Sequence, residues 1–119
     1  MKIEKSFWNQ KKVLITGHSG FKGVWLSIIL KELGASIYGI SKENLNCDLY
    51  NFSSRKDIFV EEHFIDLGVS SSDELKKVLS SKKFDIVFHL AAQSLVPEAY
   101  INPLDTLKVN IFGTFYILM

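Results

Sequence analysis

The sequence predicts an α/β protein with a doubly wound parallel sheet between two helical layers, a three-layer Rossmann-type arrangement. Strand-like apolar runs alternate with helix-like runs along most of the 119 residues. A glycine-rich turn joins the first strand-like run to the first helix-like run, as in folds that bind phosphate groups. Right-handed crossovers would then give the strand order 3-2-1-4, with a ligand at the carboxyl ends of the strands.

Four segments have the apolar, β-branched character of buried strands. The first is apolar throughout after its lysine, as expected for a strand that is covered on both faces. The predicted strands are Lys12–Thr16, Ala35–Ile40, Glu62–Leu67 and Phe84–Ala91. Between the second and third strands, residues 41–54 are polar and irregular, and we expect a loop with a short helix near residues 55–59.

Three longer segments have helical periodicity or helix-ending signals. Phe21–Leu33 is followed by Gly34, a residue typical of the position after a helix C-terminus. Ser71–Ser81 begins with a Ser-Ser-Asp-Glu sequence that suits a helix N-terminus, and its leucines and valine share one face. Thr106–Met119 is the last predicted helix, after a loop that contains Pro97 and Pro103.

The composition is that of an ordinary globular protein, with 47% hydrophobic and 23% charged residues and a net charge of +1. This charge offers no electrostatic basis for binding nucleic acid or an anionic membrane. Cys47 is the only cysteine, which excludes an internal disulfide and suits a reducing compartment. The N-terminus is too polar for a signal peptide, and no apolar run could span a bilayer, so we expect a cytoplasmic protein.

The C-terminal segment predicts that more chain belongs to this fold. Residues 111–119 are apolar and end without a polar cap. A doubly wound sheet normally continues beyond its fourth strand. We therefore expect residues 1–119 to be one partial N-terminal domain, incomplete on the C-terminal side of its sheet, with the substrate-binding and catalytic part absent.

The glycine-rich turn has the spacing Gly17-x-x-Gly20-x-x-Gly23. Backbone N–H groups near Phe21 and Lys22, at the predicted start of a helix, would face a pyrophosphate. The alternative is a tight turn into a helix with no ligand. The Lys22 side chain would either add charge near the phosphates or lie in solvent.

These motifs together resemble those of the extended short-chain dehydrogenase/reductases. The residues that carry the resemblance are Thr16-Gly17-x-x-Gly20-Phe21-x-Gly23, an Asp after the third strand, His89-Leu90-Ala91-Ala92-Gln93, and Asn110-x-x-Gly113-Thr114. Within that superfamily, His18, Lys22 and Trp25, together with residues 91–96, are most similar to the CDP-glucose 4,6-dehydratases. The resemblance extends from Phe7 to Leu118 and covers only the N-terminal part of the family's length.

The resemblance implies an NAD-dependent lyase of deoxysugar biosynthesis that converts CDP-D-glucose into CDP-4-keto-6-deoxy-D-glucose. Hydride would leave sugar C4 for the nicotinamide, water would be lost across C5 and C6, and the hydride would return to C6. The cofactor supplies the redox chemistry, while the protein supplies orientation and acid–base groups. The family also implies a homo-oligomer.

The resemblance further implies a set of cofactor-binding residues and, within this chain, no catalytic or metal-binding residue. The cofactor-binding set comprises Gly17, His18, Gly20, Phe21, Lys22, Gly23, Glu43, Asp66, Leu67, Leu90, Ala91, Ala92, Gln93 and Asn110. We expect His18 to touch the cofactor without acting in catalysis. The catalytic Tyr, Lys and Ser/Thr are expected beyond Met119.

Individual members of this set have expected roles and plainer alternatives. Asp66 would accept a hydrogen bond from the adenine amino group, or simply end a strand. Leu67 would line the adenine pocket. The small residues of 90–93 would let the ribose and nicotinamide approach the backbone, or merely form a strand-to-loop transition. Asn110 would order the site or pack between helices, and we expect His89 to be a hydrogen-bonded core histidine and His63 a surface residue.

The residues after the second strand bear on cofactor choice. Glu43 lies about 20 residues beyond the last glycine, where an acidic residue binds the ribose 2′-hydroxyl of NAD, whereas Lys42 would favour a 2′-phosphate. Tyr38 and Lys42 also match the superfamily's Tyr-x-x-x-Lys signature. That signature needs a helix to bring its two side chains together. Because Tyr38 is in a predicted strand, we interpret the match as chance.

Two other classes remain open from the sequence. One is another nucleotide-sugar epimerase, dehydratase or reductase of the same superfamily. The other is a non-catalytic NAD-binding protein or remnant, which would lack the downstream catalytic residues. We expect the 119-residue chain alone to be inactive.

Overall fold

A computed structural model describes residues 4–42, 50, 55–69 and 73–119. In chain order the elements are α1 (Lys5–Trp8), β1 (Lys12–Thr16), α2 (Phe21–Glu32), β2 (Ser36–Ser41), α4 (Arg55–Ile58), β3 (Phe59–Phe64), α5 (Asp73–Ser81), β4 (Ile86–His89), α6 (Val96–Ile101), α7 (Pro103–Leu107), the π-helix η1 (Lys108–Phe112) and α8 (Gly113–Leu118). The four strands form one parallel sheet in the order β3-β2-β1-β4, which confirms the predicted Rossmann-type topology.

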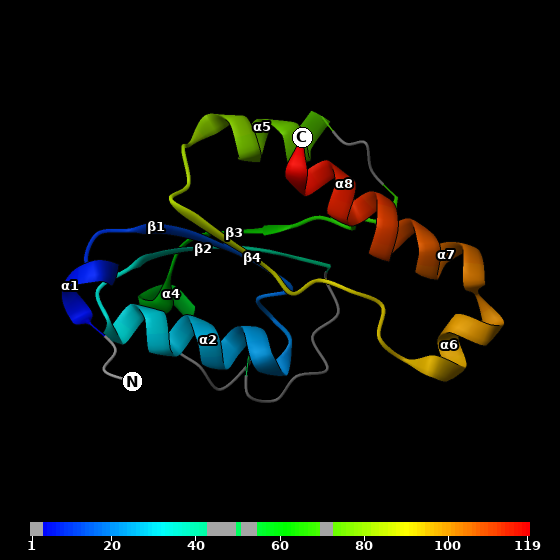
Figure 1. Cartoon of the computed structure of the whole chain (residues 1–119), viewed down its shortest axis with the longest axis horizontal. Coiled ribbons are helices and arrows are strands. Elements are labelled where there is room, and N and C mark those ends of the chain that lie inside the picture. Colours follow the sequence, from blue (N-terminus) through cyan, green and yellow to red (C-terminus); the bar gives the residue numbers. More distant parts are fainter. Residues whose placement is uncertain (1–3, 43–49, 51–54, 70–72) are drawn as a thin grey trace.

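Helices cover both faces of this sheet (Figure 1): α2 lies below it, and α5 and α8 lie above it. Side chains of β1 alternate between two hydrophobic clusters, as expected for a central strand. Val13 and Ile15 pack in the cluster between the sheet and α2, and Leu14 packs in the cluster on the α5 side. All three are fully buried. The central strand is therefore fixed from both sides.

The strand register places three residues in line at the carboxyl edge of the sheet. Thr16, the last residue of β1, lies opposite Ile40 in β2 and opposite His89 in β4. The turns that follow these strands consequently meet at one edge, where ligands bind in open parallel sheets.

The third strand lies nearer the N-terminus than the sequence pattern predicts. We expected Glu62–Leu67, and β3 is Phe59–Phe64. Phe59 is buried in the cluster between the sheet and α2, and the strand begins directly after α4. Ile65 still hydrogen-bonds to Ser41 through its backbone N–H, but the chain then turns away from the sheet. Asp66 and Leu67 therefore lie after the strand.

The segment around Pro97 and Pro103 was predicted to be a loop, and this prediction is wrong. Pro97 is the second residue of α6, and Pro103 is the first residue of α7. Proline is tolerated in the first helical turn, because the N–H that it lacks has no partner there. The predicted helix Thr106–Met119 begins within α7 and passes through the π-helix η1 before α8.

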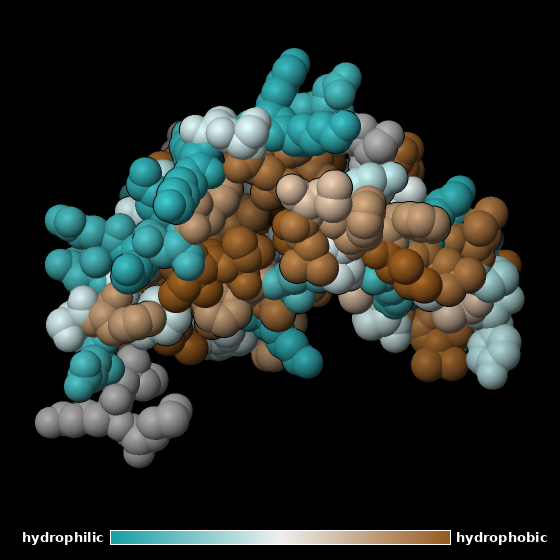
Figure 2. All heavy atoms as spheres, turned by 45° about the horizontal axis from the view of Figure 1, so that its top comes forward, coloured by the Kyte–Doolittle hydropathy of each residue, from teal (hydrophilic) through white to brown (hydrophobic). Residues whose placement is uncertain are grey.

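Apolar surface is exposed on the α5–α8 side. A hollow of about 720 Å³ lies between α5, β4 and α8, lined chiefly by Leu79, Phe84, Val87, Tyr116 and Ile117. Figure 2 shows apolar atoms exposed across the middle of this face and along the arm at its right, which contains α6 and α7. Among the described residues, no helix is both long and apolar enough to cross a membrane.

Candidate functional site

The turn between β1 and α2 packs directly against the segment that follows β4. Gly17 donates its N–H to the Ile40 carbonyl over 2.7 Å and has a φ of +71°. A Cβ at Gly17 would lie 2.8 Å from the Ala91 nitrogen and 2.9 Å from the Leu90 carbonyl carbon. Only glycine fits this position, because both the φ angle and the neighbouring backbone exclude a side chain.

The other two glycines of the motif have different surroundings. A Cβ at Gly23 would lie 2.3 Å from the Gly17 oxygen, so Gly23 lets α2 pack against the turn. A Cβ at Gly20 would meet only the Gly17 oxygen, at 3.4 Å, and would otherwise point into open space. The first and third glycines therefore shape the turn, while the second leaves its outer side open to a close ligand.

The start of α2 completes this cradle. Gly20 is the N-cap residue, and the helix begins at Phe21. The first N–H groups of a helix have no partner within it and carry partial positive charge. The side chains of Phe21 and Lys22 are exposed. This arrangement fits the pyrophosphate of a dinucleotide, and the groups that would bind it are the backbone N–H groups at the start of α2, near Phe21 and Lys22.

The His18 side chain points into the protein. The ring is fully buried, and its Nε2 lies 3.0 Å from Glu62 Oε1. The same carboxylate oxygen accepts a hydrogen bond of 2.6 Å from the Tyr50 hydroxyl. A Cβ at Gly39 would lie 2.6 Å from the ring, so β2 also packs closely on it. Any contact of His18 with a cofactor is consequently left to its backbone.

Asp66 lies at the carboxyl edge beside Lys42. Its Oδ2 is 2.8 Å from the Lys42 ammonium, and its Oδ1 accepts the Gly68 N–H over 2.9 Å. Partial burial works against ionisation of Asp66, but the bonds from Lys42 and Gly68 outweigh it and hold the pKa of the carboxyl below its usual value. An ionised acceptor is thus present where an adenine amino group was predicted to bind.

Two further predictions at this edge have different outcomes. Leu67 is only 4% exposed and packs in the α5-side cluster, where a Cβ at Gly113 would lie 3.1 Å from it. Its side chain therefore packs in the core on the α5 side of the sheet, and its predicted contact with adenine stays a prediction. Glu43 lies outside the described residues, so its predicted contact with the ribose stays a prediction.

The segment 90–93 is held at both ends. Leu90 donates its N–H to the Thr16 carbonyl over 3.0 Å. Asn110 Oδ1 accepts the Gln93 N–H over 2.8 Å, and Asn110 Nδ2 donates to the Gln93 carbonyl over 2.9 Å. Asn110 belongs to the π-helix, a deviation that is frequent at functional sites. Of the two interpretations of Asn110, the structure supports ordering of the post-strand segment.

Three residues of this edge were not among the predicted site residues. Thr16 and Thr114 both lie within hydrogen-bond distance of the His89 ring, at 2.6 Å and 3.1 Å. This confirms that His89 is a hydrogen-bonded, partly buried histidine. The signal in the sequence was a hydroxyl at the end of β1 and another in the Asn-x-x-Gly-Thr motif.

The Tyr38–Lys42 pair does not form a catalytic dyad. Tyr38 is in β2, is 7% exposed, and packs edge-on against Phe84. Lys42 is instead paired with Asp66. The interpretation of this match as chance is therefore confirmed by the strand geometry.

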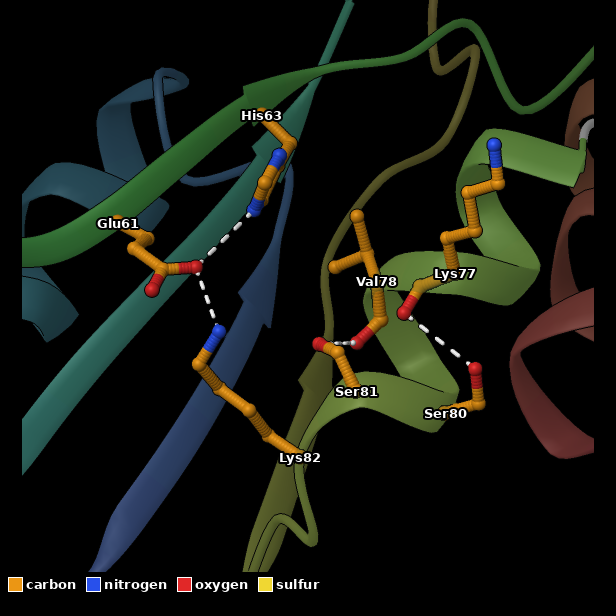
Figure 3. A network of polar contacts seen from close by, with 7 residues as sticks. All are labelled: Glu61, His63, Lys77, Val78, Ser80, Ser81 and Lys82. Atoms are coloured by element: carbon orange, nitrogen blue, oxygen red, sulfur yellow. Dashed lines mark hydrogen bonds and ion pairs between the residues drawn. The ribbon is translucent and has the colours of Figure 1, made fainter.

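A second polar network joins β3 to the end of α5 (Figure 3). Glu61 in β3 contacts His63 at 3.5 Å and Lys82 at 2.7 Å, and nearby serines bond to carbonyls of α5. The hydrogen bond from Lys82 lowers the pKa of Glu61. The prediction that His63 is a surface residue is only partly met, because its side chain is 30% exposed.

The fold and the cradle define a class, the dinucleotide-binding Rossmann-type domains. A sequence model described as GDP-mannose 4,6 dehydratase matches residues 14–119. The chain therefore belongs to the GDP-mannose 4,6-dehydratase family of nucleotide-sugar enzymes.

Comparisons with individual proteins lead to the same class of nucleotide-sugar enzymes. The chain is 37% identical over 116 residues to CDP-glucose 4,6-dehydratase of Salmonella typhimurium strain LT2, a match that covers 98% of the chain and 32% of the relative. It is 35% identical over 120 residues to UDP-glucuronate 4-epimerase 2 of Arabidopsis thaliana, covering 92% of the chain and 26% of the relative. The structure of epimerase Mth375 from Methanothermobacter thermautotrophicus is 28% identical, with a TM-score of 0.74, covering 97% of the chain and 32% of that protein. The chain thus spans about a third of the length of the CDP-glucose enzyme.

Proposed function

We propose that this chain is the NAD-binding part of a nucleotide-sugar 4,6-dehydratase that converts CDP-D-glucose into CDP-4-keto-6-deoxy-D-glucose. The substrate-binding and catalytic groups would come from the two-thirds of the relatives' length that the chain does not span. The complete enzyme would be a cytoplasmic homo-oligomer that binds neither nucleic acid nor membranes. The 119-residue chain alone would not turn over the substrate.

The observation that carries this proposal is the cradle at the carboxyl edge. Gly17 and Gly23 close the turn against backbone, and Gly20 leaves its outer side open at the start of α2. Together with the similarity to a CDP-glucose dehydratase over 98% of the chain, this supports NAD as the ligand and CDP-glucose as the sugar nucleotide.

NAD, when bound, would accept a hydride from the sugar and return it later in the reaction. The chain's own residues would hold and orient it. The N–H groups at the start of α2 would bind the pyrophosphate, the ionised Asp66 would accept a hydrogen bond from adenine, and the backbone of 90–93 would face the nicotinamide half. Because Asn110 already fixes that segment, less conformational entropy would be lost when the cofactor binds.

The test is a substrate panel on the complete protein, supplied with NAD. CDP-glucose, dTDP-glucose, GDP-mannose and UDP-glucuronate would be compared by product mass. Loss of water from CDP-glucose alone, or from it most efficiently, is the expected result. Turnover of another sugar nucleotide in preference to CDP-glucose would contradict the substrate assignment while leaving the class intact.

A second candidate is an epimerase of the same class. It is supported by the 35% identity to a UDP-glucuronate 4-epimerase, which is close to the 37% found for the dehydratase. A product with unchanged mass and an inverted sugar centre would identify this activity. Binding of NAD without turnover of any substrate would instead identify a non-catalytic NAD-binding protein.

A further inference from the structure

His89 connects three elements at the carboxyl edge. It ends β4, and its ring lies between the end of β1 and the start of α8. Thr16 Oγ1 is 2.6 Å from Nδ1, and Thr114 Oγ1 is 3.1 Å from Nε2. Both ring nitrogens therefore face a hydroxyl group.

The surrounding bonds fix the direction of each hydrogen. The backbone carbonyl oxygen of Asn110 can only accept a hydrogen bond, so the Thr114 hydroxyl donates to it, over 2.8 Å. Thr114 Oγ1 must then accept from His89 Nε2, which places the imidazole proton there. In a neutral imidazole Nδ1 is then the acceptor, and the Thr16 hydroxyl donates to it.

A backbone amide begins this series of hydrogen bonds. Ala91 donates its N–H to Thr16 Oγ1 over 3.2 Å. These hydrogen bonds form a chain in which each group donates to the next, from the Ala91 amide through Thr16, His89 and Thr114 to the backbone carbonyl of Asn110. Every hydroxyl in the chain donates once and accepts once, which satisfies all the partly buried polar groups along it.

Both ends of the chain belong to the candidate site. The Ala91 nitrogen is the backbone atom that packs against Gly17, and Asn110 holds Gln93 at its N–H and carbonyl. We propose that His89, Thr16 and Thr114 are positioning residues that hold segment 90–93 against the glycine turn, through a directed hydrogen-bond chain that requires neutral His89 protonated on Nε2. The proposal rests on the proposed function only in taking segment 90–93 to face the cofactor.

Protonation of His89 would disrupt this order. A proton on Nδ1 would face the Thr16 hydroxyl, which would have to turn its own hydrogen away while still accepting from Ala91. The groups that face the two nitrogens are uncharged hydroxyls from β1 and α8, so they do not stabilise a charged ring. Burial lowers the pKa of His89, which favours the neutral form at neutral pH.

The experiment uses the complete protein and three variants. Thr114→Val removes one hydroxyl at nearly constant shape, and Thr114→Ser keeps that hydroxyl. His89→Gln supplies an N–H for Thr114 without titrating near neutral pH. His63→Gln and Ser80→Ala are the matched controls, since both side chains belong to the separate network of Figure 3. Hydrogen exchange of residues 90–95 is measured without cofactor at about pH 7.5 and about pH 5.5, on either side of the usual histidine pKa. NAD affinity is measured under the same conditions.

The expected result is a fall of about fivefold or more in the exchange protection of 90–95 in Thr114→Val, equivalent to one lost hydrogen bond. Thr114→Ser should restore protection, and exchange in β1 should stay unchanged, which excludes global destabilisation. In the wild-type protein, the exchange protection of residues 90–95 and the NAD affinity should both fall as the pH is lowered to about 5.5, whereas His89→Gln should show no such fall.

The proposal would be overturned if exchange protection of residues 90–95 in Thr114→Val equalled that of the wild-type protein. It would also be overturned if Thr114→Ser lost protection as Thr114→Val does, or if His89→Gln kept the pH dependence of the wild-type protein. Because exchange is measured without cofactor, the two proposals can fail separately. The expected exchange pattern in a protein that binds no NAD would support positioning and contradict the proposed function. If the protein binds NAD but exchange in Thr114→Val equals that of the wild-type protein, the proposed function would be supported and the positioning role contradicted.

Discussion

Asn110 holds Gln93 at both of its backbone groups, accepting the N–H over 2.8 Å and donating to the carbonyl over 2.9 Å. The Gln93 side chain is in turn bonded to Thr106 at 3.0 Å and to the Leu95 backbone. The helix that carries Asn110 and the segment after β4 therefore form one polar unit, although 17 residues separate them in sequence.

Replacing Asn110 with Ala should loosen this unit. Two partly buried backbone groups of Gln93 would lose their partner, which costs about 1–3 kcal/mol for each such group that water does not reach. We expect a lower free energy of unfolding and weaker NAD binding in the complete protein, by denaturant titration and calorimetry. Asn102→Ala, which removes an exposed side-chain bond to Glu98, is the control and should change little. Equal effects of the two substitutions would contradict this role.

The three glycines should respond differently to alanine. Gly17→Ala would place a Cβ 2.8 Å from backbone at a φ of +71°, and Gly23→Ala would place one 2.3 Å from the Gly17 oxygen. Both should destabilise the complete protein by several kcal/mol, on the order of a strained, overpacked site.

Gly20→Ala should behave in another way, because its Cβ meets only one atom at 3.4 Å. We expect thermal stability near that of the wild type and NAD affinity reduced by about tenfold, since the methyl group occupies the open side of the cradle. Thermal melts and a binding titration separate the two effects. Unchanged NAD affinity in this variant would argue against a phosphate at the turn.

The Lys42–Asp66 pair predicts a pH effect with a definite sign. The pKa of Asp66 is lowered in the folded protein, so its ionised form adds stability above the ordinary pKa of about 3.9. That stability is lost as the pH falls through the lower, folded-state pKa. Because Lys42 is largely exposed, its loss in Lys42→Met should cost less than about 1 kcal/mol.

The direct readout is an NMR titration of the Asp66 carboxyl, whose pKa should rise in Lys42→Met. Lys82→Met is the matched control: it should raise the pKa of Glu61 and leave Asp66 unaffected. An unchanged Asp66 titration in Lys42→Met would show that the pair does not set this pKa.

Tyr38→Phe tests whether the Tyr-x-x-x-Lys match has a function. The tyrosine is buried in β2, with Lys82 5.4 Å from the centre of its ring. Because phenylalanine keeps the ring and its contact with Phe84, we expect unchanged turnover by the complete protein and a stability change within about 1 kcal/mol. A loss of turnover without a loss of stability would contradict the assignment.

Much of the fold could be predicted from the sequence, because the buried strands and the glycine turn carry strong local patterns. The boundaries that moved depended on tertiary packing. Phe59 fills the core between the sheet and α2, so β3 begins nearer the N-terminus, and the prolines of α6 and α7 occupy first-turn positions rather than a loop.

The candidate site was predicted less evenly. The glycines and Asp66 lie at the carboxyl edge, as the pattern indicated. The inward orientation of His18 and the bonds of His89 depend on contacts with residues 44 and 73 positions distant, which no local pattern reveals. Asn110 could be suspected from its motif, but its bonds to Gln93, 17 positions away in sequence, are seen only in the structure.

The most direct test of the central claim follows one hydrogen atom through the reaction of the complete protein with NAD. CDP-glucose carrying deuterium at sugar C4 would be supplied as substrate, and the product examined by NMR and mass spectrometry. The account predicts a 4-keto-6-deoxy product with the deuterium at C6. No product, or deuterium kept at C4 of a sugar that has not lost water, would contradict it.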